Sequence, residues 1–241
     1  MFGPAWTLAV ALALQSAGVQ ATPRTDRPLT GLFSNLAKDM RAVPSIDTAN
    51  WLALGSAGAL AGYDSDARIS NWSARSGKPS YTRAGSVLGN GWIQSGGAIA
   101  TYAAGRLAGK PEVAHVGSDL IRAQALNGLV TNAIKVAVNR QRPSGGIHSF
   151  PSGHTSATFA SAAVLQAHYG WKAGAPAFAT ASFVGWTRIR DRRHWLSDVA
   201  FGAAIGVISG RTVARTHGPR RVTMVPAKTR GGFSVTFFVN N

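Results

Sequence analysis

Apolar stretches with helical spacing follow one another along most of the chain and are separated by short polar breaks. Near the middle of one stretch, Phe159, Ala163 and Val164 fall on one side of a helix, and Gly170 and Gly210 are typical C-terminal stops. The pattern predicts an all-α fold, a helical bundle of about six core helices. The expected helices span residues 30–42, 47–62, 85–108, 111–139, 152–169, 173–190 and 194–215.

Two segments depart from this pattern. The segment from Tyr63 to Arg83 is rich in Asp, Ser, Gly and Arg, which predicts a loop that could overhang a site at this end of the bundle. Near the C-terminus, RVTMVPA and FSVTFFV alternate polar and apolar residues around KTRGG, which predicts a short β-hairpin. Because two strands alone are marginally stable, we expect the hairpin to pack on the bundle or to pair with another element. The expected domains are therefore a helical-bundle domain over 22–218 and a hairpin appendage over 219–241.

The N-terminus has the composition of an export signal. An apolar run from Trp6 to Leu14 precedes the small-residue segment Val19-Gln20-Ala21, so residues 1–21 are expected to be a signal peptide and the protein to be exported to the periplasm. An uncleaved membrane anchor is the alternative. The longest later charge-free stretch, Ala84 to Gly105, is interrupted by Gly, Asn, Gln and Ser. A bundle facing water is thus expected, with an integral membrane protein as the alternative.

The charge balance indicates which partners the chain attracts. It has 25 Lys and Arg against 9 Asp and Glu, a formal net charge of +16, and no Cys. This charge favours phosphate-bearing substrates and peripheral contact with an anionic membrane. Because the sequence has no aromatic-basic stacking motif and no helix-turn-helix pattern, nucleic acid is not an expected partner.

The first segment with candidate chemistry is KVAVNRQRP, residues 135–143. Lys135 and Arg142 are seven residues apart, two turns of helix, and would project from nearly one side if the helix persisted to Pro143. A planar guanidinium and a compact ammonium suit the oxygens of one phosphate. The alternative is a solvated basic helix end, with Arg140 as one more surface charge.

The second segment is PSGH, residues 151–154. Pro151 disfavours helix before it, Ser152 is a good N-cap, and Gly153 and His154 open a helix. The free N–H groups and positive dipole end of a helix N-terminus favour an anion, the Ser152 hydroxyl can donate, and His154 can act as an acid. Taken alone, the segment is also an ordinary helix start.

The third segment is TRIRDRRHWLSD, residues 187–198. On a helix His194 and Asp198 share a face, so the carboxylate can accept one ring N–H, fix the tautomer and leave the other nitrogen bare as a nucleophile. Arg188 can turn back towards the same point across a polar bend. A surface hydrogen bond between the His and the Asp is the alternative.

Together K-x6-R-P, PSGH and R-x5-H-x3-D, in this order, resemble the signature of the type 2 phosphatidic acid phosphatase superfamily. That superfamily also includes bacterial nonspecific acid phosphatases and vanadate-dependent haloperoxidases. The resemblance implies a helical core, with His194 as nucleophile, Asp198 as its orienting partner and His154 as general acid. It also implies a phosphate cradle made by Lys135, Arg142, Ser152, Gly153 and Arg188.

The sequence departs from the family pattern at two places. Thr187 stands where Ser usually precedes the arginine, which keeps a hydroxyl. Only residues 144–150 separate the first two motifs, which is shorter than in the nonspecific acid phosphatases and argues against that assignment.

The expected function is a phosphohydrolase that needs no metal and no cofactor and cleaves lipid-linked phosphomonoesters or pyrophosphates through a phosphohistidine. A metal at His154, His194 and Asp198 is the competing interpretation, but three nearby cations would repel it. A vanadate-dependent haloperoxidase, a nonspecific acid phosphatase and a nonenzymatic basic binding protein are the alternatives. The cations should lower the pKa of both histidines while Asp198 raises that of His194, so we expect opposed protonation states and a bell-shaped pH profile.

Overall fold

The computed structural model describes residues 31–217, 221–229 and 232–240, with side chains up to Thr216. This part of the chain contains eight helices, so the predicted all-α fold is confirmed. The expected signal peptide at 1–21 lies outside the described residues. The helices are α1 (Leu32–Ala42), α2 (Ile46–Arg75), α3 (Thr82–Leu88), α4 (Gly91–Leu107), α5 (Pro111–Val138), α6 (Gly153–Tyr169), α7 (Trp171–Arg190) and α8 (Leu196–His217).

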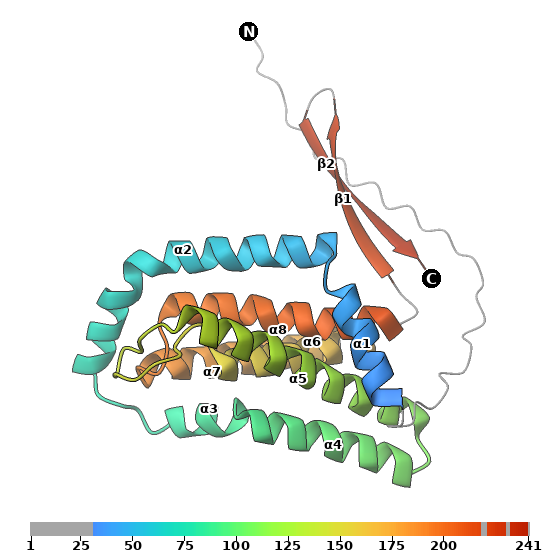
Figure 1. Cartoon of the computed structure of the whole chain (residues 1–241), viewed down its shortest axis with the longest axis horizontal. Coiled ribbons are helices and arrows are strands. Elements are labelled where there is room, and N and C mark those ends of the chain that lie inside the picture. The colour runs from blue at the N-terminus through green and yellow to red at the C-terminus, as the bar shows by residue number, and fades with distance from the viewer. Residues whose placement is uncertain (1–30, 218–220, 230–231, 241) are drawn as a thin grey trace.

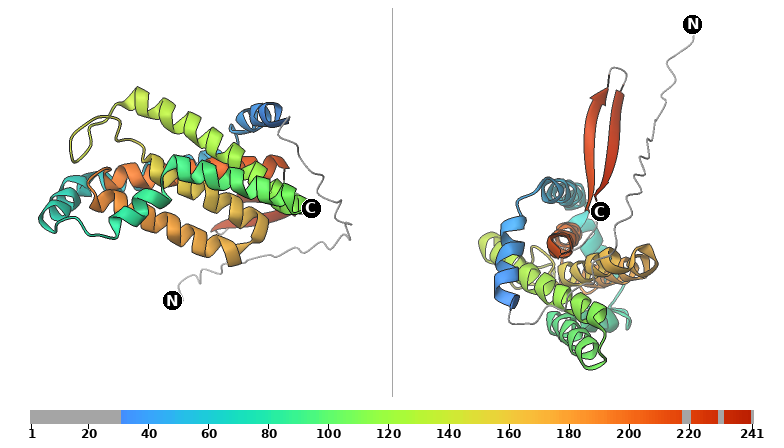
Figure 2. Two further views of the ribbon diagram at one scale, coloured as in Figure 1. Left: turned by 90° about the horizontal axis from the view of Figure 1, so that it is seen from below. Right: turned by 90° about the vertical axis from the view of Figure 1, so that its right-hand side faces the viewer.

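Helix α8 lies near the centre of the bundle (Figure 1). It contacts α2, α5 and α6, while α4 packs along α5 and α7 packs along α6. Two further views show α1 crossing one end of the bundle, where it meets α5 and α8 (Figure 2). A cluster of buried apolar side chains joins α4, α5, α6 and α8: Ala98, Val116, Leu120, Ala123, Leu126, Val164 and Val213.

Small residues let the central helices approach closely. A Cβ atom at Gly206 would overlap the carbonyl oxygen of Ser156, and one at Gly210 would overlap that of Ala160. Both glycines therefore place α8 directly against the backbone of α6. This close contact holds α6 along α8, and both helices begin at the end of the bundle where the predicted site residues lie.

The prediction of a loop over 63–83 is wrong for its first part, because α2 continues to Arg75. Asp66, Ser70 and Ser73 are buried at helical spacing, so this part of α2 turns a polar face inwards. An apolar stripe was the signal for a helix, and a helix whose buried face is polar lacks it.

The helix expected over 85–108 is divided into α3 and α4. The break falls at Gly89 and Asn90, where the Asn90 side chain accepts a hydrogen bond of 2.8 Å from the backbone N–H of Trp92. Asn90 therefore caps the start of α4. The helix expected over 47–62 starts within one residue of α2 but ends thirteen residues too early, and the remaining expected helices match the observed bounds within about two residues.

The C-terminal tail forms two antiparallel strands, β1 (Arg221–Thr229) and β2 (Gly232–Asn240), with Arg221 opposite Asn240. The side chains of both strands lie outside the described residues. The expected appendage packed on the bundle, and the domain bounds that go with it, stay predictions.

Candidate active site

The three segments singled out in the sequence meet at one end of the bundle, on the left in Figure 1. There α5 and α7 end, and α6 and α8 begin. Helix α5 ends at Val138, within one residue of the expected bound, because Asn139 takes a left-handed conformation with φ 43°. The helix does not persist to Pro143, so Arg142 lies in a loop and does not share a helix face with Lys135.

The His194 side chain is buried and its ring is held by a backbone carbonyl. Its Nδ1 lies 2.7 Å from the carbonyl oxygen of Ser149 and 3.7 Å from Oδ2 of Asp198. The expected direct hydrogen bond to Asp198 is therefore replaced by one to Ser149. Because a carbonyl oxygen can only accept, the proton must sit on Nδ1, and Nε2 keeps a free lone pair.

Asp198 is fully buried and its carboxylate receives three donors. Nη1 of Arg140 donates to Oδ1 at 2.7 Å, and the Ser149 hydroxyl and the backbone N–H of Trp195 donate to Oδ2. Burial acts to raise the pKa of Asp198, but the neighbouring His194 ring and then these three donors hold it below its ordinary value. Asp198 therefore keeps its negative charge behind His194.

Arg140 is the residue that sequence reasoning missed. The local sequence indicates only a surface charge. In the structure Nη1 of Arg140 binds Asp198 at 2.7 Å, and Nη2 binds Asp66 of α2 at 2.8 Å. Its guanidinium also lies over the Tyr63 and Trp195 rings. The partners come from 58 and 74 residues away in the chain, so no local pattern could have indicated them.

Lys135 and Arg142 bring positive charge to the loop between α5 and α6. Nζ of Lys135 donates to the carbonyl oxygens of His148 and Pro151 at 2.8 and 2.6 Å. Burial, followed by the charge of Arg142, lowers the pKa of Lys135 to about 8. Nε of Arg142 donates to the carbonyl oxygen of Ile147 at 3.1 Å.

Helix α6 begins at Gly153 with Ser152 as its N-cap, as predicted. The Ser152 side chain is buried and its Oγ accepts a hydrogen bond of 2.9 Å from Thr155, while its backbone N–H donates to the carbonyl oxygen of Asp198 at 3.0 Å. These contacts tie the start of α6 to α8. Gly153 and His154 follow and line a cavity.

Arg188 turns towards α3. Its Nη2 donates to the hydroxyl of Ser86 at 2.6 Å, to Oδ2 of Asp191 at 2.9 Å and to the carbonyl oxygen of Thr82 at 3.1 Å. The segment that covers this side of the site is thus α3 rather than the loop expected over 63–83. Arg188 is buried, so its positive charge is poorly screened.

The fields of these groups converge on the two histidines. The pKa of His154 is lowered to about 4 by burial first and then by Arg188, His194 and Arg142. Burial, with Lys135 and Arg142, also lowers the pKa of His194, although Asp198 opposes this. Both pKa values are thus lowered, as expected, which favours the neutral form of each imidazole at neutral pH, and the expected opposed protonation states at mildly acidic pH stay a prediction.

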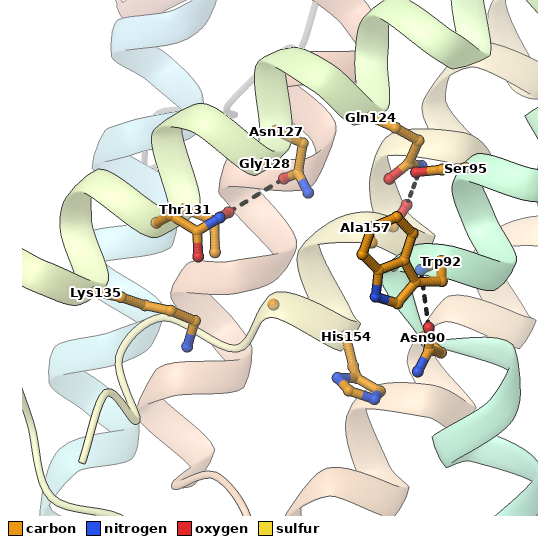
Figure 3. Close-up of a pocket in the computed structure, with 13 residues that line it drawn as sticks. Asn90, Trp92, Ser95, Gln124, Asn127, Gly128, Thr131, Lys135, His154 and Ala157 are labelled. Atoms are coloured by element: carbon orange, nitrogen blue, oxygen red, sulfur yellow. Dashed lines mark hydrogen bonds between the residues drawn. The ribbon is translucent and has the colours of Figure 1, made fainter.

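A cavity of about 380 Å³ lies between α4, α5 and α6, and Lys135, Gly153 and His154 are the predicted site residues that line it (Figure 3). Lys135 and His154 lie at one end of it, and the indole of Trp92 lies across from His154. Farther along, the wall is rich in amide and hydroxyl groups. Its polar lining residues include Asn90, Ser95, Gln124, Asn127, Thr131 and Asn132.

Comparison with known proteins finds similarity in the part of the chain that carries the candidate site. The model of the PAP2 superfamily matches residues 118–221. A lipid A 1-phosphatase of Porphyromonas gingivalis is 42% identical over 90 residues, which cover 36% of this chain and 20% of the relative. The chain thus spans about a fifth of the length of that curated relative.

Two solved structures share the fold. The crystal structure of LpxE from Aquifex aeolicus has a TM-score of 0.51 at 23% identity and covers 62% of this chain and 94% of its own. The crystal structure of the first transmembrane PAP2 type phosphatidylglycerolphosphate phosphatase from Bacillus subtilis has a TM-score of 0.54 at 18% identity. The match covers 78% of this chain and 94% of that chain.

Proposed function

We propose that this chain, whose residues 118–221 match the model of the PAP2 superfamily, is a metal-independent phosphohydrolase that removes phosphate from a lipid-linked phosphomonoester through a phosphohistidine at His194. The relatives named as phosphatases act on lipid phosphates, as their names state. The geometry at His194 supports the reaction type, and the adjoining cavity supports a polar leaving group.

The observation that carries the proposal is the fixed tautomer of His194. Nδ1–H donates to the Ser149 carbonyl at 2.7 Å, so Nε2 is free to attack phosphorus in line with the leaving oxygen. As the N–P bond forms, the ring becomes positively charged. The carboxylate of Asp198, 3.7 Å from Nδ1, stabilises that charge.

His154 is the acid that protonates the leaving oxygen. Burial is the first cause of its low pKa of about 4, and the nearby positive charges lower that pKa further. A bound phosphate dianion would offset Arg188 and Arg142 and raise that pKa, so His154 would take up a proton together with the substrate. Water then hydrolyses the phosphohistidine, and neutral His154 removes the proton from that water.

The polar cavity indicates what kind of leaving group fits. Amide side chains of Asn90, Gln124 and Asn127 line it beyond His154, so it matches a headgroup with hydroxyl or amide groups better than a bare acyl chain. The proposed substrate is therefore a lipid whose phosphate sits on a polar headgroup. Pyrophosphates of lipids share the same terminal phosphate chemistry and belong to the test panel.

Exposed apolar side chains on the outer surface support a function at a membrane. Leu54 and Leu60 of α2 are 62% and 74% exposed, and Trp92 at the cavity is 87% exposed. Exposed apolar surface on this scale is typical of contact with lipid or another protein. One described helix, residues 196–216, is long and apolar enough to cross a membrane, and 67% of its apolar window is buried inside the bundle. We propose an exported enzyme that contacts the membrane through these outer faces.

The test is release of inorganic phosphate from lipid A, phosphatidate, phosphatidylglycerophosphate, undecaprenyl pyrophosphate and a soluble aryl phosphate. His194→Asn should lower turnover of the preferred substrate by at least about a thousandfold, because the nucleophile is lost. Acid-labile, base-stable phosphate should be trapped on the wild-type chain and not on the variant. Turnover retained by a folded His194→Asn variant would contradict the proposal.

A further inference from the structure

A second cluster of potential ligand groups lies at the opposite end of the bundle from His194. His115 and Asp119 are four residues apart on α5, so they share a helix face, and His168 comes from the last turn of α6. His115 is 20 residues before Lys135 on the same helix, which places it about 30 Å away along the axis. The cluster is therefore separate from the phosphate site.

The three residues offer one ligand atom each within 4.8 Å of one another. Nε2 of His168 lies 2.8 Å and Nε2 of His115 lies 3.6 Å from Oδ2 of Asp119. In a tetrahedral site with bonds of about 2.0–2.2 Å, ligand atoms are about 3.3–3.6 Å apart. Only small side-chain adjustments would bring all three atoms onto one ion.

His115 is the group that a hydrogen-bond network alone does not explain. It is 3% exposed, and neither of its ring nitrogens has a hydrogen-bond partner among the described residues. A buried polar group without a partner is costly, so its persistence requires a reason. Its Nε2 faces the Asp119 carboxylate at 3.6 Å, which is slightly too long for a hydrogen bond. Two ligand atoms of one metal ion lie at a similar distance from each other.

The surrounding residues orient Asp119 and leave one of its oxygens available. Arg122 binds Oδ1 of Asp119, and its other nitrogen binds Asp39 of α1 at 3.0 Å. Asp39 in turn accepts from Thr216 of α8. One guanidinium thus faces two carboxylates, which leaves one negative charge among these three buried side chains. Outer contacts of this kind orient the ligands of metal sites.

We propose that His115, Asp119 and His168 bind a divalent transition-metal ion that joins α5 to α6 and, through Arg122, Asp39 and Thr216, to α1 and α8. Two imidazoles and one carboxylate favour zinc or a similar ion over magnesium or calcium, which prefer oxygen ligands. The site is structural: it lies about 30 Å from the chemistry at Lys135 and His194. The fourth position is left to water.

The experiment uses the full chain without a histidine tag, treated with chelator and then dialysed against zinc. One zinc per chain is expected by elemental analysis, and the melting temperature should rise by roughly 5–10 °C at a hundredfold excess of zinc over its dissociation constant. A wild-type chain that retains no zinc and shows no shift would overturn the proposal, whatever the variants do.

Variants locate the ion. His115→Ala removes a ligand that has no hydrogen bond to lose, and His168→Gln can keep a hydrogen bond to Asp119 while being a poor ligand. Both should lose the zinc and the thermal shift. His194→Asn should keep both, because it alters only the phosphate site. Loss of zinc from the His194→Asn variant, with zinc retained by the His115→Ala and His168→Gln variants, would refute the assignment. Phosphate release is measured separately, so a failed metal site leaves the proposed function untouched.

Discussion

At the scale of single residues, Arg140 orients the negatively charged Asp198 carboxylate that lies beside His194. This guanidinium joins Asp198 to Asp66 and so ties the start of α8 to α2. Arg140→Gln should lower kcat by about tenfold to a hundredfold with a smaller effect on KM, because Asp198 would lose its orientation while the phosphate cations remain. Arg140→Lys should restore part of the loss by restoring the charge.

The matched control is Arg75→Gln at the exposed end of α2, which should leave both constants unchanged. Steady-state kinetics and melting curves of the variants separate positioning from folding. If Arg140→Gln lost stability but kept kcat in its folded fraction, the positioning role would be wrong.

The pKa of Lys135, which burial lowers to about 8, predicts an alkaline limit on activity. The ammonium is charged below that pKa and is lost as pH rises through it, so the phosphate cradle loses one cation and kcat/KM should fall above pH about 8. Lys135→Arg keeps its charge at all these pH values and should move the fall to higher pH. An alkaline fall at the same pH in both proteins would assign it to another group.

At the scale of elements, the contact of α6 with α8 sets the distance between His154 and His194. Gly206→Ala forces a methyl group onto the Ser156 carbonyl and should lower the melting temperature by about 3–10 °C. It should also lower kcat, because the two helix starts carry the two histidines.

Gly97→Ala on α4 is the control, because a Cβ there meets nothing within 4 Å and alanine favours helix. It should leave activity unchanged and the melting temperature equal or slightly higher. A Gly206→Ala variant as active and stable as Gly97→Ala would show that this close approach is not required.

The elements also show what could be predicted from the sequence. Helices with a cap, a stop and an apolar face, such as α5 and α6, were predicted almost to the residue, because those signals are local. The second half of α2 was missed because its buried face carries Asp66, Ser70 and Ser73. The end of α5 at Val138 leaves Arg142 in a loop instead of on the helix face of Lys135, and the partners of Arg140 come from distant segments. Motif spacing thus predicted which segments meet at one end of the bundle, whereas tertiary contacts decided the geometry of their side chains.

At the scale of the whole molecule, α2 has the reverse of the usual polarity. It buries Thr48, Asp66, Ser70 and Ser73 against the bundle and exposes Leu54 and Leu60 on its outer side. Such a helix gains little in water from its outer leucines, whereas contact with acyl chains would remove that surface from water. With the formal net charge of +16, both apolar and electrostatic terms favour an anionic membrane.

This arrangement predicts that the protein floats with vesicles containing anionic lipid, and that salt weakens the binding only in part, because the apolar contribution is not screened. Changing both Leu54 and Leu60 to Gln should shift the chain towards the aqueous fraction and leave the melting temperature nearly unchanged, since both side chains are largely exposed. Ser56→Gln on the same helix changes an exposed polar position and should have no effect. If the double variant floated as well as the wild type in high salt, the outer face of α2 would not be the membrane contact, and the apolar residues of α4 around Trp92 would be the next surface to change by the same argument.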